Sequence, residues 1–169
     1  MKNLRSGMAL IILFAIEPTH AQEMKKEPAA ILEIGGAGNW DVKGGGSSYG
    51  PSLAIEMTPI EHWLEVEAGT TPLFSRGQTE WDFDLLFKKP FTLSNTVEFM
   101  VGIGPSWSHV VSNGRSSDSL GAEVALDFML WPTKSRTFGR YLEPSYGRSF
   151  SAGNEQSVSV SVGLLIPIR

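Results

Sequence analysis

The chain has 169 residues, of which 41% are hydrophobic, carries a net charge of −4 at pH 7, and contains no cysteine. This length suits a single domain, and the missing thiols exclude a disulfide framework and any thiolate metal site. The negative charge argues against a nucleic-acid partner. We predict no cofactor and no resident metal.

The first 21 residues have the three parts of an export signal. Two basic residues precede an apolar stretch over 8–16, and small residues, Thr19 and Ala21, stand at the two positions that a signal peptidase reads. This stretch is far shorter than the roughly 20 residues that a membrane-spanning helix needs. We therefore predict a signal peptide over 1–21, cleaved after Ala21, then a short polar segment over 22–29 and a β-barrel domain over 30–169.

A polarity pattern of period two recurs from Ile31 to Ile168. In its clearest stretch, apolar residues hold the odd positions from 81 to 87 and acidic residues hold the even positions from 80 to 84. A helix of period 3.6 does not separate residues in this way. The strands predicted in chain order cover 32–37, 52–57, 64–69, 80–87, 97–104, 122–130, 138–146 and 157–168. This even number predicts an all-β fold, an eight-stranded antiparallel up-and-down β-barrel.

The connections between these strands alternate in character. The even ones contain Pro59, Pro90 and Pro132, which end a strand and begin a turn. The odd ones are rich in glycine and serine and cover 41–50, 70–78, 111–119 and 148–156. We expect the odd loops at one end of the barrel, where they could bind an extracellular ligand, and the even turns at the other.

Alternation alone leaves open which face lines the interior. An inward apolar face would make a soluble lipocalin-like barrel, periplasmic or secreted, that holds an apolar ligand. An outward apolar face would make a transmembrane barrel in contact with lipid. The polar face mixes small residues with carboxylates, as a narrow lumen would, and Trp63, Trp81 and Trp107 stand near strand ends, as in an aromatic belt. We favour the transmembrane interpretation.

In this pattern the chain resembles the small eight-stranded outer-membrane barrels of Gram-negative bacteria, from Ile31 to Arg169. The resemblance implies a bacterial outer-membrane location, contact with membrane lipid, and a structural, adhesive or surface-binding role. One feature departs from the family: its members commonly end on an outward aromatic residue that the assembly machinery recognises. This chain ends Ile166-Pro167-Ile168-Arg169.

Carboxylates crowd the polar face. The predicted lumen acids are Glu56, Glu65, Glu67, Asp82, Asp84, Glu98, Glu123 and Asp127, with Glu33 and Glu143 on the same face. The predicted lumen bases are Arg140 and Arg148, with Lys88 nearby. Acids sharing a lumen of low dielectric should be neutralised by protons, water or a cation. The simpler interpretation is a hydrogen-bonded network, and the sharper one is a cation held by Glu65, Glu67, Asp82 and Asp84.

The resemblance also raises lipid A chemistry, because some eight-stranded barrels use a serine, a histidine and a carboxylate to act on lipid A. The candidates in this chain are Ser106, His109 and Glu123, with Ser108 and Asp118 nearby. Ser108 directly precedes His109, and neighbours in a strand point to opposite faces. We therefore do not predict an enzyme.

Overall fold

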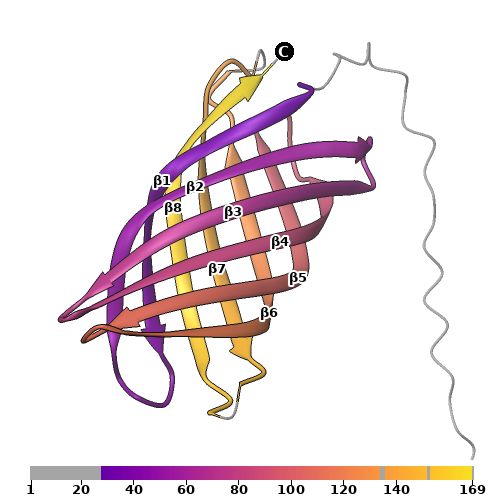
Figure 1. Ribbon diagram of the computed structural model, residues 1–169. Helices are drawn as coiled ribbons and strands as arrows, with labels where there is room; N and C mark the ends of the chain where they lie inside the picture. Colours follow the sequence, from indigo (N-terminus) through magenta and orange to yellow (C-terminus); the bar gives the residue numbers. More distant parts are fainter. Residues whose placement is uncertain (1–27, 134–135, 152, 169) are drawn as a thin grey trace, which may run out of the picture.

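The computed structural model describes residues 28–133, 136–151 and 153–168, which form a closed barrel of antiparallel strands (Figure 1). The strands are β1 (Ala30–Asp41), β2 (Ser47–Ile60), β3 (Leu64–Ser75), β4 (Gln78–Thr92), β5 (Val97–Ser112), β6 (Arg115–Leu130), β7 (Gly139–Ser149) and β8 (Gln156–Ile168). Each strand pairs with its neighbours in the chain, and β8 closes onto β1. The predicted eight-stranded up-and-down barrel is confirmed. The predicted signal peptide lies outside the described residues.

The strands extend further toward the odd connections than alternation predicts. Pairing continues to Ser75↔Gln78 between β3 and β4, and to Ser112↔Arg115 between β5 and β6. Asn113 and Gly114 then turn the chain with φ of 49° and 75°, as in the tight hairpin turns that favour Asn-Gly. Most of the predicted loops 70–78 and 111–119 is therefore strand, because backbone pairing continues through their polar residues.

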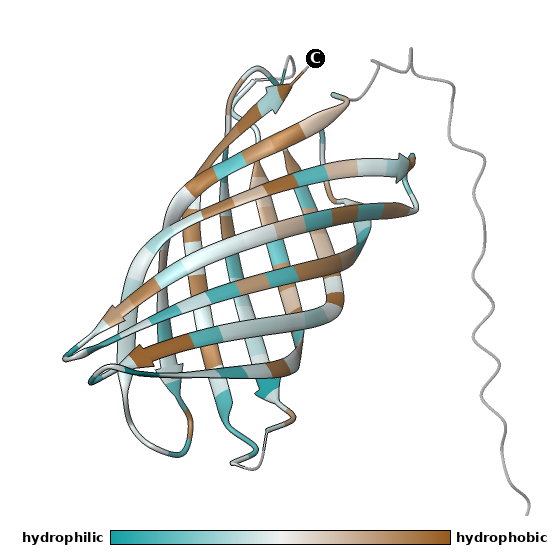
Figure 2. Ribbon diagram, viewed as in Figure 1, coloured by the Kyte–Doolittle hydropathy of each residue, from teal (hydrophilic) through white to brown (hydrophobic). Residues whose placement is uncertain are grey.

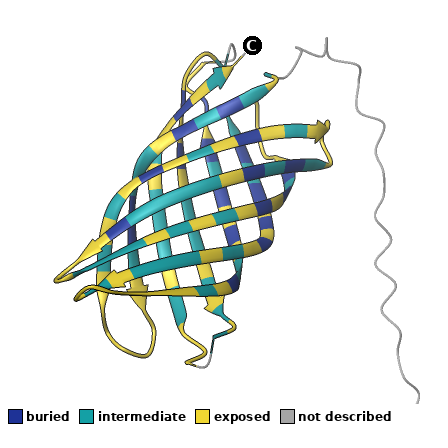
Figure 3. Cartoon of the chain, in the orientation of Figure 1, coloured by how far each residue is buried: buried dark blue, intermediate teal, exposed yellow. Residues whose placement is uncertain are grey.

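The apolar face of the sheet points outward. Along each strand exposed apolar residues alternate with inward residues that are more buried and more polar (Figures 2 and 3). Trp63 is 59% exposed and Ile103 is 60% exposed, values that are costly in water when repeated over a whole surface. A barrel surrounded by lipid has this polarity. The alternative of a soluble barrel around an apolar ligand is therefore wrong.

Aromatic residues stand on the outer surface toward both ends of the barrel. Trp40, Tyr49 and Trp107 are exposed toward the odd connections, and Trp63 and Phe91 toward the even ones. Aromatic side chains favour the headgroup level at both edges of a bilayer. No helix in the described part of the chain is long and apolar enough to cross a membrane.

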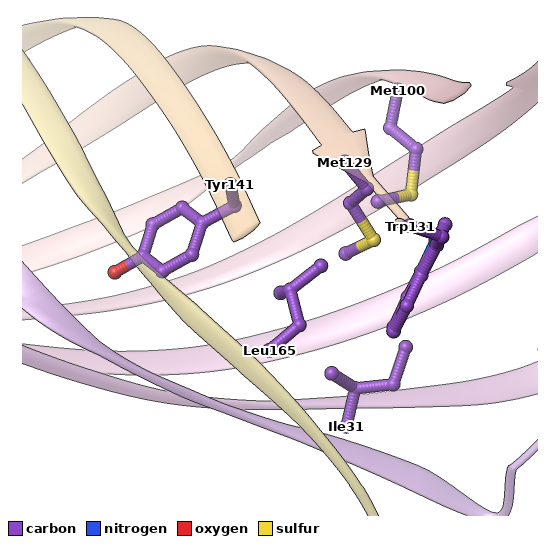
Figure 4. Close-up of a cluster of buried hydrophobic side chains, with 6 residues drawn as sticks. All are labelled: Ile31, Met100, Met129, Trp131, Tyr141 and Leu165. Atoms are coloured by element: carbon purple, nitrogen blue, oxygen red, sulfur yellow. The ribbon is translucent and has the colours of Figure 1, made fainter. Parts of the chain in front are cut away.

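An apolar plug fills the interior at the even-turn end. It consists of Ile31, Met100, Met129, Trp131, Tyr141 and Leu165 (Figure 4). Trp131, which follows β6, is 1% exposed, and Leu165 is fully buried. Sequence alternation assigned Met100 to the polar face and did not predict this plug. Inward positions close to the even turns thus carry large apolar residues together with two buried acids, Glu65 and Glu98.

Candidate functional site

Lys88 occupies the centre of a polar network inside the barrel. Its side chain is 1% exposed, and its Nζ donates hydrogen bonds to Asp127 Oδ2 at 3.1 Å, to Glu143 Oε2 at 2.6 Å and to Glu67. Glu56 Oε2 lies 3.8 Å from the same nitrogen. These acids come from β2, β3, β6 and β7, while Lys88 is on β4. One side chain therefore connects five strands across the lumen.

The register of the sheet makes room for this lysine. Lys88 pairs with Glu65 on one side and with Gly102 on the other. A Cβ atom at Gly102 would lie 2.9 Å from Lys88 Cγ, too close for a side chain at that position. The glycine of β5 therefore allows the lysine stem to lie flat across the wall and to direct its ammonium group at the acids.

Several buried carboxylate oxygens have no hydrogen-bond partner. They are Glu33 Oε1, Asp84 Oδ2 and Asp127 Oδ1, while the carboxyl group of Glu56 meets that of Glu65 and lies 3.8 Å from Lys88 Nζ. Glu33, Glu56 and Asp127 are 2%, 1% and 0% exposed. Glu33, Glu56, Glu67 and Asp127 each offer a carboxylate oxygen, and these atoms all lie within 4.8 Å of one another. We call these four residues the carboxylate cluster.

A cavity of about 470 Å³ lies at the odd-connection end of the lumen. Serines line much of its wall, together with acidic residues and one arginine, Arg148. The acids are Asp41, Glu80, Asp82, Asp84, Glu123 and Glu155. We call this cavity the vestibule. A smaller cavity of about 60 Å³ shares Asp82, Asp84 and Glu123 with it and is also lined by Glu33 and Glu67.

The structure places the predicted lumen acids in two groups. Those buried in the interior are Glu56, Glu65, Glu67, Glu98 and Asp127, and those that line the cavities are Asp82, Asp84 and Glu123. The four acids first considered for a cation, Glu65, Glu67, Asp82 and Asp84, are thus divided between both groups. Glu98 stands apart near the even turns, where Arg136 Nη1 donates to its Oε2 at 2.9 Å.

Of the two arginines expected in the lumen, Arg148 lines the acidic vestibule and Arg140 lies outside the lumen. Arg140 is exposed between the buried residues Gly139 and Tyr141, so it faces outward. Arg148 is exposed at the rim of the vestibule, where it donates to Asn154 Oδ1 at 3.4 Å. The alternation of β7 was hard to follow in the sequence because Pro144 interrupts it. In the structure the inward positions include Gly139 and Tyr141, and Arg140 lies between them. Lys88, only a nearby candidate from the sequence, is the central base.

The catalytic candidates do not converge. His109 is on the outward parity of β5, and its Nδ1 lies 2.8 Å from Asp118 Oδ1 on β6. Ser106 and Glu123 line the vestibule inside the wall, and Ser108 shares a hydrogen bond of 2.8 Å with Ser119. A nucleophile and its base must meet within hydrogen-bond distance. The barrel wall separates the serine from the imidazole.

Comparison with known proteins places this geometry among solved barrels. No protein-family model and no curated protein matches the chain. The crystal structure of Neisserial surface protein A superposes with a TM-score of 0.66 and 13% identity, covering 85% of this chain and all of that one. The chain has the fold of the small eight-stranded outer-membrane barrels.

Two further structures support the same assignment. Ail, the attachment invasion locus protein of Yersinia pestis, matches with a TM-score of 0.59 and 13% identity over 83% of this chain and 98% of that chain. The N-terminal β-barrel domain of Pseudomonas aeruginosa OprF matches with a TM-score of 0.58 and 12% identity over 83% and 100%. This fold and the outward apolar face agree on a membrane-spanning barrel of the outer-membrane type.

Proposed function

We propose that this protein is an integral barrel of the bacterial outer membrane that binds ligands or surfaces at its odd-connection end, without catalysis. The observation that carries this proposal is the contrast within the lumen. The apolar plug fills the even-turn end, the Lys88 network crosses the middle, and the vestibule of about 470 Å³ lies at the odd-connection end. A ligand would approach from that end.

The orientation follows from where the strands begin and end. The start of β1 and the end of β8 pair with each other, Ala30 with Ile168, at the even-turn end (Figure 1). An exported chain that inserts from the periplasm keeps its ends there, so the odd hairpins cross to the outside. The plug then lies on the periplasmic side, and the vestibule opens toward the exterior.

The odd connections carry exposed basic residues that suit a polyanionic surface. They are Lys43, Arg76, Arg115 and Arg148, one at each odd hairpin, and all are exposed. Three exposed acids, Asp41, Asp118 and Glu155, stand at the same end. Exposed basic side chains attract phosphate and sulfate groups through charge and hydrogen bonds. We call these four residues the basic rim and propose it as the adhesive surface.

One solved relative supports an attachment role for a barrel of this fold. Ail is described as an attachment invasion locus protein, and its structure has also been solved in complex with the heparin analogue sucrose octasulfate. The ligand belongs to Ail. For this chain the support comes from the basic rim, which offers charged groups of the sign that a sulfated ligand would need.

Membrane insertion is tested by fractionating cells that express the full-length chain. We expect recovery in the outer membrane, extraction only with detergent, and different gel mobility before and after heating, because a closed barrel resists unfolding in detergent. Recovery in the soluble periplasm without a heat-dependent shift would overturn the proposal.

The adhesive role is tested by binding of the expressing cells to immobilised heparin. Changing the four basic-rim residues together to glutamine should reduce binding at least tenfold and weaken its salt dependence, because the ionic contacts are lost. Arg140→Gln, which removes an exposed charge away from the rim, is the matched control and should bind like the parent. Equal binding by all three would contradict an adhesive basic rim.

A further inference from the structure

We propose that the lumen holds one hard divalent cation, with Ca²⁺ as the best fit, on the carboxylate cluster beside Lys88. The ion would use Glu33 and Glu56 together with the oxygen of Asp127 that Lys88 does not engage. This site lies deep in the barrel and is separate from the basic rim. It therefore goes beyond the proposed surface function, and either proposal can fail without the other.

Lys88 has fewer hydrogen-bond donors than the buried acids around it could accept. A lysine ammonium has three N–H groups. The Nζ of Lys88 directs hydrogen bonds at Glu67, Asp127 and Glu143, which uses all three. Glu33 and Glu56, which are 2% and 1% exposed, therefore accept no hydrogen bond from Lys88, although Glu56 Oε2 lies 3.8 Å from its Nζ. One positive charge faces four buried carboxylates and the partly buried Glu143, and a buried charge without a partner is strongly unfavourable.

Two oxygen atoms of the cluster remain without a hydrogen-bond partner, Glu33 Oε1 and Asp127 Oδ1. The carboxyl group of Glu56 meets that of Glu65 and lies 3.8 Å from Lys88 Nζ, so two acids and one base share this part of the lumen. Carboxylate oxygens that share an interior site in this way could coordinate a cation. Because they belong to three different strands, β1, β2 and β6, the closed barrel brings them together in one place.

The spacing of the carboxylate oxygens suits a calcium ion. The ligand oxygens of the carboxylate cluster all lie within 4.8 Å of one another, and two oxygens on opposite sides of a Ca²⁺ ion stand about 5 Å apart, since Ca–O bonds are about 2.4 Å. The three proposed ligands, Glu33, Glu56 and Asp127, all offer carboxylate oxygens, which hard cations such as Ca²⁺ prefer to nitrogen or sulfur ligands. Mg²⁺ needs bonds of about 2.1 Å in near-ideal octahedral geometry and fits this irregular set less well.

A cation would reach the carboxylate cluster from the vestibule. The cavity of about 60 Å³ is lined by Glu33 and Glu67 and shares Asp82, Asp84 and Glu123 with the vestibule. Carboxylates therefore follow the route from the rim to the cluster and raise the local cation concentration. The apolar plug fills the lumen at the even-turn end. The arrangement accordingly suits a binding site better than a passage.

The direct test is equilibrium dialysis of the refolded full-length barrel against ⁴⁵Ca²⁺ at neutral pH, after treatment with a chelator. We expect one bound Ca²⁺ per barrel. Glu33→Gln keeps the shape of the side chain and removes its charge, so the affinity should fall at least tenfold. Glu61→Gln changes an exposed turn acid and should bind like the parent. No binding by the parent, or equal binding by both variants, would overturn the site.

Thermal unfolding of the same proteins gives a second readout. Saturating Ca²⁺ should raise the Tm of the parent by roughly 5 °C when its concentration exceeds the dissociation constant about 100-fold. Lys88→Met removes the built-in competitor, so its Tm should depend on Ca²⁺ more strongly than that of the parent. If acid but not Ca²⁺ stabilises both Lys88→Met and the parent, protons neutralise the cluster and the proposal fails. Should Lys88→Met not fold, the Glu33→Gln and Glu61→Gln pair decides.

Discussion

The two ends of the lumen are built from the same strands but have opposite chemistry. On β6 the inward positions run from Ser117 and Ser119 through Glu123 and Asp127 to Met129, so polarity changes along a single strand. Trp131 completes this series just beyond the strand. The inward face of this barrel is therefore not uniformly polar. Its composition changes with distance from the even turns, from serines and acids at the vestibule to the apolar plug.

The largest expected effect comes from removing the base between the two ends. Lys88→Met should destabilise the barrel by about 3–5 kcal/mol in chelator-containing buffer, because it leaves buried acids without their ammonium partner. The measurement is urea unfolding in lipid vesicles. Lys89→Met is the neighbouring control. Lys89 Nζ donates to the exposed carbonyl of His62 and lies about 6 Å from the rings of Trp63 and Phe91, and loss of these exposed contacts should change stability by less than about 1 kcal/mol. Equal losses of stability in Lys88→Met and Lys89→Met would show that Lys88 stabilises the barrel no more than an exposed lysine does.

The apolar end is tested by Trp131→Ala. Truncating this buried indole should cost about 3 kcal/mol, because it leaves a cavity among Ile31, Met129 and Leu165. Single-channel recordings in planar bilayers should also show greater conductance than the parent, because the plug loses its largest member. Ser119→Ala at the vestibule end should leave conductance unchanged. An unaltered conductance for Trp131→Ala would mean that the lumen is blocked elsewhere.

A smaller effect is expected where the plug meets solvent. Arg136 pairs with Glu98 at 2.9 Å and lies 5.5 Å from the ring of Trp131. Arg136→Gln should lower stability by about 1 kcal/mol, since a partly exposed ion pair and a cation–π contact are both modest. Denaturant titration of Arg136→Gln, Glu98→Gln and the double variant should give a sum of single effects greater than the double effect. Additive losses would rule out coupling between the two side chains.

The sequence was sufficient to predict the strands, their number and the polarity of the wall. Period two was clear wherever outward apolar residues were large, as from Trp81 to Phe87. It was less informative near the odd turns, where polar residues continue the pairing through Ser112↔Arg115. There the hydrogen bonds of the sheet, and not the side chains, decide where a strand ends.

The interior was less predictable because its contacts join distant parts of the chain. The carboxylates were assigned to the polar face, but the partners of Lys88 on four other strands depend on the closed register. Arg140 was assigned to the wrong face because Pro144 interrupts the alternation of β7, and a shift of one residue moves a side chain to the other face. The plug was missed because Met100, Met129 and Leu165 share the inward parity with acids, and alternation carries no information about depth along the lumen.

The position of Lys88 also has a consequence for assembly. Its partners come from both the early strands β2 and β3 and the late strands β6 and β7. A sheet without β6 and β7 would leave this ammonium group without Asp127 and Glu143, and a buried charge with too few partners is costly. The charge of Lys88 is therefore fully paired only when the late strands close the barrel.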